Sequence, residues 1–293
     1  MILIVGCGYL GSCIAAEALK TQSEKIVCAV RSASARFAFE GADITLCDVT
    51  DKDSLAALLK KTGGEELKVF YLAANHFVDR VFESPEEAKK VNIDSLKNFL
   101  DLFSRKINRL FYASTDCVYG ENTAEIPAFL ETSPLAPVNE YGRQKLEAEK
   151  AVRDYGFTAL RLPFMAGESF TESKKSFYDN ICKSLQNGEK IEMIDGMRRN
   201  TLSYKKAASL ALSLMNCDKP LPEIINVAGD RAYTKYETGL AIAKKIGADP
   251  GLVKPISFEE GQKFFKDKRA DNSVMSNALL KETLGLSFIP WEG

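Results

Sequence analysis

The segment MILIVGCGYLG, residues 1–11, determines the fold class that we expect. Its apolar run Met1–Val5 leads into a glycine-rich turn and then into an alanine-rich, helix-like stretch over 12–20. The turn reads Gly6-Cys7-Gly8-Tyr9-Leu10-Gly11. A G-x-G-x-x-G turn between a buried strand and a helix is typical of a dinucleotide-binding βαβ unit. Gly6 permits the tight turn, Gly8 admits the pyrophosphate and Gly11 allows close helix packing, so the whole turn, Tyr9 and Leu10 included, is predicted to bind the cofactor.

Apolar runs alternate with helix-like patterns over the first 160 residues. Strands are predicted at 1–5, 25–30, 43–47, 68–72, 109–113 and 157–162, and helices at 12–20, 52–61, 85–104 and 140–155. This alternation is typical of a parallel sheet with helices on both faces. Right-handed crossovers then favour an α/β fold with a Rossmann-type, doubly wound sheet.

The pattern loosens after residue 163, where polar runs replace the alternation. A helix over 207–215 and a strand over 224–228 follow, and we expect that strand to return to the main sheet. We therefore expect a cofactor-binding domain of residues 1–163 plus about 206–229. The segments of about 164–205 and 230–293 are predicted to form a smaller, mixed substrate-binding lobe.

Composition excludes several functions. The 39 Lys and Arg residues nearly balance 40 Asp and Glu residues, which argues against nucleic-acid binding. No apolar run is long enough for a membrane span and no signal-peptide pattern precedes the first strand, so we expect a cytoplasmic protein. Seven cysteines without a C-x-x-C pair, and one histidine, predict no metal site.

The end of the second predicted strand indicates which dinucleotide is bound. An acidic residue there would hold the ribose hydroxyl of NAD, but the chain has Arg31 and Ser32, with Arg36 nearby. These donors suit a 2′-phosphate, so NADP(H) is favoured over NAD(H). Asp48 and Val49 follow the third strand and could bracket an adenine, although an Asp stabilised by a helix dipole explains the carboxylate equally well.

A second set of polar residues points to acid–base chemistry. Tyr141 and Lys145 are spaced i, i+4 and therefore share one helix face, where the ammonium should lower the pKa of the phenol. Ser114 and Thr115 follow a predicted strand, and a hydroxyl at a strand's carboxyl end can bond a substrate carbonyl oxygen. Turn or capping chemistry is the alternative for these two hydroxyls.

Several longer segments, taken together, resemble the extended short-chain dehydrogenase/reductase superfamily and, within it, the dTDP-4-dehydrorhamnose reductase-like branch. They are ILIVGCGYLG (2–11), LAANHFVDRVFESPEEAKKVN (72–92), ASTDCVYGE (113–121), SPLAPVNEYGRQKLEAEKAV (133–152), ALRLPFMAG (159–167) and, more weakly, RADNSVMSNALLKETLGL (269–286). The resemblance implies that Thr115, Tyr141 and Lys145 are the catalytic set of a reductase acting on a nucleotide-linked keto sugar.

The resemblance also implies further site residues. Ala73 and Ala74 match small residues that pass close to the cofactor. Asn75 and His76 fall at the rim of the substrate cleft, where a structural role for the histidine is the alternative. The predicted helices over 85–104 and 140–155 are the faces that relatives use to form homodimers.

Some features leave the exact reaction open. Arg198 and Arg199 could hold a nucleotide diphosphate, although a solvated basic loop explains them equally well. Asp116 beside Thr115 is compatible with an epimerase or dehydratase that recycles its cofactor, but the same Ser-Thr-Asp sequence also occurs among the reductases. The relatives' cleft tryptophan is missing, since the chain's one tryptophan is Trp291. A non-catalytic, NADP-binding regulatory subunit is the remaining alternative.

Overall fold

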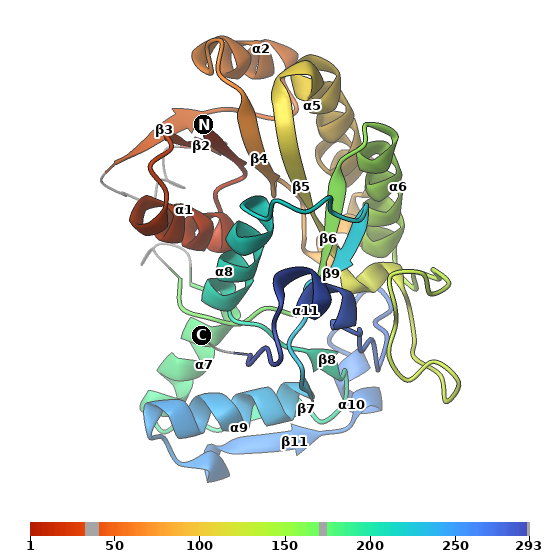
Figure 1. Cartoon of the computed structure of the whole chain (residues 1–293). Coiled ribbons are helices and arrows are strands. Elements are labelled where there is room, and N and C mark those ends of the chain that lie inside the picture. The colour runs from red at the N-terminus through yellow and green to blue at the C-terminus, as the bar shows by residue number, and fades with distance from the viewer. Residues whose placement is uncertain (33–40, 170–174, 292–293) are drawn as a thin grey trace.

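The computed structural model describes residues 1–32, 41–169 and 175–291. Its centre is a seven-stranded parallel sheet in the order β3-β2-β1-β4-β5-β6-β9 (Figure 1). The strands are β1 (Ile2–Val5), β2 (Ile26–Val30), β3 (Ala42–Leu46), β4 (Leu67–Tyr71), β5 (Ile107–Thr115), β6 (Thr158–Leu162) and β9 (Ile224–Asn226). The predicted doubly wound α/β sheet is confirmed, and the strand expected over 224–228 joins its edge beside β6. The chain changes direction between β1 and β4, the kind of switch point at which such sheets bind ligands.

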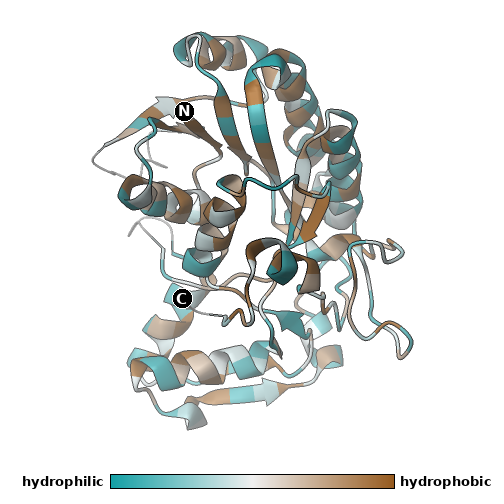
Figure 2. Ribbon diagram, in the orientation of Figure 1, coloured by the Kyte–Doolittle hydropathy of each residue, from teal (hydrophilic) through white to brown (hydrophobic). Residues whose placement is uncertain are grey.

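Helices cover both faces of the sheet because alternate side chains of each strand point to opposite sides. On β1, Ile2 and Ile4 pack with α1 and α8, whereas Leu3 and Val5 pack with α2, α5 and α6; all four are fully buried. Figure 2 shows hydrophobic residues along the central strands and on the helices around them. Burial of each such side chain contributes about 1.5–3 kcal/mol. These helices are α1 (Tyr9–Thr21), α2 (Lys52–Lys61), α5 (Ser95–Phe103), α6 (Glu140–Asp154) and α8 (Tyr204–Met215).

The helix expected over 85–104 is interrupted. It consists of α4 (Pro85–Lys89), a π-helical turn η2 (Lys90–Asp94) and α5, and the short helix α3 (Val78–Glu83) precedes it. A π turn inserts one extra residue into the helix and reorients its side chains. Here the turn carries Asn92, whose side chain bonds both backbone groups of Asn75 and the side chain of Gln144 on α6. The interruption therefore ties the loop after β4 to α6.

A second lobe lies below the main sheet in the view of Figure 1. Parallel strands β7 (Ile191–Ile194) and β11 (Val253–Ile256) pair in it, and helices α7 and α9 pack on them around a separate apolar core. Within the described ranges, no helix combines the length and the apolarity that a membrane crossing needs. The remaining elements are α7 (Phe177–Gln186), β8 (Arg199–Asn200) paired with β10 (Ala232–Tyr233), α9 (Lys235–Ile246), α10 (Phe258–Gln262), α11 (Ala278–Leu284) and the 3₁₀ turns η3 (Ser104–Lys106), η4 (Asp116–Val118) and η5 (Pro250–Leu252).

Candidate active site

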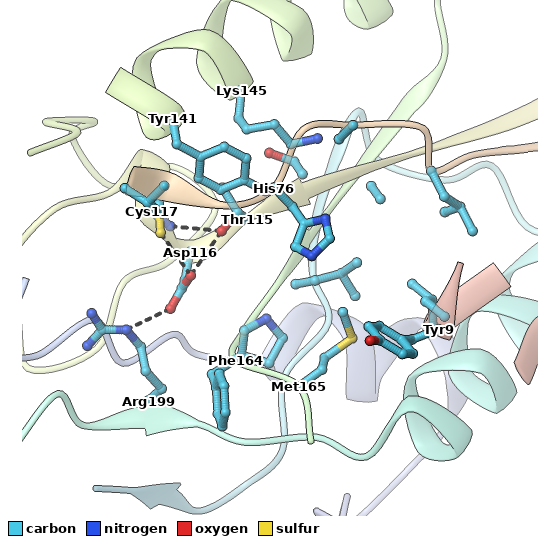
Figure 3. A pocket seen from close by; sticks show the side chains of 18 of the residues that line it. Tyr9, His76, Thr115, Asp116, Cys117, Tyr141, Lys145, Phe164, Met165 and Arg199 are labelled. Carbon is cyan, nitrogen blue, oxygen red and sulfur yellow. Dashed lines mark hydrogen bonds and ion pairs between the residues drawn. The ribbon is translucent and has the colours of Figure 1, made fainter. Parts of the chain in front are cut away.

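A cavity of about 460 Å³ lies between the carboxyl ends of the central strands and the second lobe (Figure 3). The glycine turn after β1 forms one side of it. Thr115, Tyr141 and Lys145 line its centre, and Lys235 and Arg269 line the side formed by the second lobe. Residues from both halves of the chain therefore converge on one cavity.

The glycine turn has the geometry that its sequence predicts. Gly6 has φ +89°, and a Cβ atom there would lie 2.5 Å from the backbone nitrogen of Ala73. A Cβ atom on Gly11 would lie 3.0 Å from the carbonyl oxygen of Gly6 and 3.2 Å from Ile4, so helix α1 packs closely on the strand. A Cβ atom on Gly8 would meet no atom within 4 Å. Gly8 therefore presents open backbone at the start of α1, where an anion is stabilised.

The residues predicted to select the dinucleotide lie outside the lining of the cavity. Arg31 and Ser32 are exposed just after β2, and Arg36 falls outside the described residues. Asp48 accepts hydrogen bonds from the backbone and the hydroxyl of Thr50, which are the main reason that its pKa is lowered, and Arg31 adds to this effect. Arg31 and Asp48 thus act at the same end of the sheet, and the partly buried Val49 packs against the apolar cluster below it.

Only part of the loop after β4 lines the cavity. The backbone of Ala73 lies close to Gly6 of the glycine turn, and Ala74 lines the cavity. Asn75 does not line it, and its backbone is bound by Asn92. His76 lines the cavity and packs on the ring of Phe77, with 4.3 Å between ring centroids.

The two hydroxyls at the end of β5 have different partners. Ser114 donates to Glu149, which also binds Arg161 through two hydrogen bonds of 2.9 and 2.7 Å in the buried core. Thr115 instead donates to Asp116 and accepts from the backbone N–H of Cys117. Thr115 is therefore the hydroxyl that stays beside Tyr141, as Figure 3 shows.

Tyr141 and Lys145 project from α6 into the same region (Figure 3). Both are buried, with exposed fractions of 9% and 2%. Burial lowers the pKa of Lys145 to about 7, an effect that Glu149 partly opposes. The Lys145 amine lies 4.2 Å from the ring centroid of Tyr112 and 6.0 Å from that of Tyr141.

The expectation that Lys145 lowers the pKa of the Tyr141 phenol was wrong for this structure. The pKa of Tyr141 is raised rather than lowered, first by burial and then by Cys117 and Asp116, while Thr115 opposes the shift. The physical reason is that a fully buried phenolate loses its hydration, and an amine whose own pKa has fallen offers little positive charge in exchange.

Asp116 and Arg199 form a buried pair at the edge of the cavity. Arg199 Nε lies 3.0 Å from Asp116 Oδ2, and burial raises the pKa of this carboxyl. Three further N–H groups of Arg199 donate to backbone carbonyls, so at most one of its five is available to a ligand. Arg198 does not line the cavity, and its guanidinium binds Glu237. A bidentate grip on a diphosphate would require these contacts to break.

Several cavity residues were not among the predicted site residues, although many of them fall in the segments that carry the resemblance. Met197 has φ +55°, a conformation that is rare outside glycine, and its backbone N–H is held by Asp271. Tyr204 stacks on Tyr9 with 5.4 Å between ring centroids. The others are Leu72, Val78, Ala113, Cys117, Leu162, Pro163, Phe164, Met165, Lys235, Phe265 and Arg269.

The fold and this cavity define an extended short-chain dehydrogenase/reductase. The chain belongs to the family described as RmlD substrate binding domain, which matches residues 1–293. The predicted membership of the dTDP-4-dehydrorhamnose reductase-like group is therefore confirmed.

The known proteins to which the chain is similar differ in the functions that their names give. Methionine adenosyltransferase 2 subunit beta of Xenopus tropicalis is 26% identical over 266 residues, covering 88% of this chain and 75% of that protein. The probable low-salt glycan biosynthesis reductase Agl14 of Haloferax volcanii is 27% identical over 249 residues, covering 84% and 80%. The structure of UDP-glucose 4-epimerase from Thermus thermophilus in complex with NAD superposes with a TM-score of 0.81 at 21% identity, covering 96% and 92%.

Proposed function

We propose that this protein is an NADP(H)-dependent reductase of a nucleotide-linked keto sugar. The observation that carries the proposal is the meeting of Thr115, Tyr141 and Lys145 in one cavity with the glycine turn. The family and the similarity to a probable glycan biosynthesis reductase support it.

The chain's residues fit a dinucleotide. Open backbone at Gly8 and the start of α1 would hold the pyrophosphate, and Lys145 would bind the nicotinamide ribose. Arg31, exposed after β2 and acting on Asp48, would bind a 2′-phosphate, which supports our preference for NADP(H). When bound, the reduced nicotinamide supplies the hydride.

The chain's own residues supply the proton. Tyr141 is protonated near neutral pH, and its phenol would donate to the oxygen of a ketone as that oxygen becomes an alkoxide, which is a stronger base than a phenolate. Burial raises the pKa of Tyr141 and so weakens the phenol as an acid. In this structure the single hydroxyl proton of Thr115 is donated to Asp116, which Arg199 holds in place. Thr115 would donate to the substrate oxygen after its hydroxyl turns away from Asp116.

The test is NADPH consumption, followed at 340 nm, with a panel of dTDP-, UDP- and GDP-linked 4-keto sugars. One member should be reduced, and Tyr141→Phe should lose at least ~100-fold in kcat while binding NADPH normally. Tyr155→Phe, which alters an exposed phenol just beyond the same helix, is the matched control and should keep full activity. Full activity in Tyr141→Phe would reject the mechanism.

A second candidate is an epimerase or dehydratase that recycles its cofactor. The buried Asp116 beside Thr115 favours it, because a carboxyl with a raised pKa can exchange a second proton with the substrate. Such an enzyme would be purified with bound nicotinamide and would convert a 4-hydroxy sugar without consuming NADPH. Mass spectrometry of the extracted cofactor separates the two reactions.

The name of one relative, a subunit beta of another enzyme, supports a regulatory NADP-binding subunit as the third candidate. Binding of NADPH without turnover of any sugar in the panel would favour it. Residues 1–163 with about 206–229 would bind the cofactor in all three cases, and the remaining segments would bind the substrate.

We also propose a homodimer through α5 and α6. Leu102 on α5 and Tyr155 just after α6 are exposed in the single chain. Residues of a dimer interface are exposed in this way when the partner subunit is absent. Light scattering should give twice the mass of one chain, and Leu102→Asp should halve it.

A further inference from the structure

Lys235 is the first residue of α9 and lines the cavity from the second lobe. Its amine lies 2.7 Å from the ring centroid of Phe164 and 4.9 Å from that of Phe177. The residue is partly buried as a whole, and the burial of its amine places the pKa well below the ordinary lysine value. The amine therefore lies against aromatic rings at the wall of the cavity.

The charges around this amine are unbalanced. Arg199 and Arg269 oppose a positive charge on Lys235, while Asp116 and Cys117 favour one. Asp116 is already paired with Arg199, and among the described residues no carboxylate lies within ion-pair distance of the Lys235 amine. The positive end of the α9 dipole also opposes a cation at this position. The rings of Phe164 and Phe177 favour an ammonium through cation–π contacts, but a buried ammonium without a carboxylate partner is unfavourable, so this site shifts the balance toward the neutral amine.

The strand register locates this amine relative to the proposed reaction. Thr115 on β5 is level with Leu162 on β6, and Phe164 follows Leu162 by two residues. Two residues of extended chain advance about 7 Å, and neighbouring strands lie about 5 Å apart. By these spacings the backbone of Phe164 lies about 9 Å from that of Thr115, and Lys235, against the ring of Phe164, lines the same cavity as Thr115.

We infer that Lys235 is a specificity residue that binds a carboxylate or phosphoryl group of the substrate and takes up a proton from solvent as that group enters. This inference rests on the proposed function, because it places the substrate's anionic group in the same cavity. The anion restores the missing partner, and the proton then makes a charge-assisted hydrogen bond possible. The rings of Phe164 and Phe177 pack on the amine, and Arg269, whose guanidinium pairs with Asp79, lines the same wall of the cavity.

Calorimetry in two buffers of different ionisation enthalpy tests the inference. Inorganic pyrophosphate and sodium glucuronate are titrated separately, at pH 8, into the full-length protein saturated with NADP⁺. Binding should be accompanied by uptake of close to one proton, and Lys235→Met should abolish that uptake and weaken binding at least ~10-fold. A larger effect with pyrophosphate assigns the site to a phosphoryl group, and a larger effect with glucuronate assigns it to a carboxylate.

Two further variants interpret the result. Lys235→Arg carries a permanent charge and should bind the same probes without proton uptake. This variant therefore tests the inference even if Lys235→Met misfolds. Lys244→Met removes an exposed lysine from the same helix and should behave as wild type. Equal proton uptake by wild type and Lys235→Met, or no binding of either probe by wild type, overturns the inference. A prior titration with NADP⁺ alone tests the proposed function separately, because a protein that does not bind NADP⁺ would contradict that function and not the role of Lys235.

Discussion

Replacing each of two glycines in the turn by alanine separates the role of folding from the role of cofactor binding. Gly8 has φ −89° and ψ −145°, at the edge of the extended region, so alanine adds some backbone strain there, but its new methyl group would meet no protein atom within 4 Å. Gly6 has φ +89°, and its methyl group would lie 2.5 Å from the backbone of Ala73. We therefore expect Gly8→Ala to remove binding alone and Gly6→Ala to remove both.

The magnitudes follow from these contacts. Gly8 is the N-cap of α1, where alanine is less favourable than glycine by about 1 kcal/mol, so Tm should fall by about 2–4 °C. Gly6→Ala combines about 1–2 kcal/mol of backbone strain with a clash against main-chain atoms, so its total should be at least ~3 kcal/mol and its Tm should fall by roughly 10 °C. The methyl group of Gly8→Ala would stand where backbone N–H groups meet the pyrophosphate. A loss of about 2 kcal/mol there corresponds to a ~30-fold weaker Kd for NADPH.

Both quantities are measured on the same preparations. Thermal unfolding gives Tm, and quenching of protein fluorescence on titration with NADPH gives Kd. Gly64→Ala, in the exposed loop before β4 with no atom near its new methyl group, is the control and should change neither. Wild-type affinity in Gly8→Ala would refute the assignment of the turn, and a wild-type Tm in Gly6→Ala would refute the packing against Ala73.

Three other perturbations test the surrounding structure. Arg161→Met leaves Glu149 buried without its partner and should lower the free energy of unfolding, measured in urea, by about 3–5 kcal/mol. Adding Glu149→Leu should recover part of that loss. If the losses of the two single variants simply add in the double variant, the pairing is contradicted. Burial lowers the pKa of Lys145 from 10.5 to about 7, so between these pH values the unfolded chain binds more protons than the folded protein. The stability of wild type relative to Lys145→Met should therefore rise with pH from 7 to about 10. A stability difference that does not change with pH would contradict the burial of this amine. Arg31→Asp should weaken NADPH binding ~10-fold or more and strengthen NADH binding, and an unchanged ratio of the two Kd values would remove our reason for preferring NADP(H).

The parts of the fold that local chemistry specifies were predicted well. The apolar run before Gly6 and the alternation that follows indicated the order of strands and helices, because strand and helix periods are local properties of the chain. The helix over 85–104 was less well predicted. Its π turn exists so that Asn92 can reach Asn75 and Gln144, and such long-range contacts leave no periodic trace in the sequence.

The site divides in the same way. Spacing along one helix sufficed to propose Tyr141 and Lys145 as neighbours, whereas the choice of Thr115 as their partner came from the family resemblance. The structure brings all three into one cavity. The direction of the Tyr141 pKa was not available from spacing. It depends on how many atoms surround the phenol, and only packing sets that number.

By itself, the sequence determined the glycine turn, the parallel sheet and the shared helix face of Tyr141 and Lys145, since each depends on neighbours within a few residues. The tertiary structure alone decided that Arg199 pairs with Asp116 and that Lys235 meets the ring of Phe164. These partners are separated by more than 70 positions along the chain. Charge and burial at such sites are properties of the packed assembly, because the dielectric surroundings of a side chain come from whichever segments fold against it.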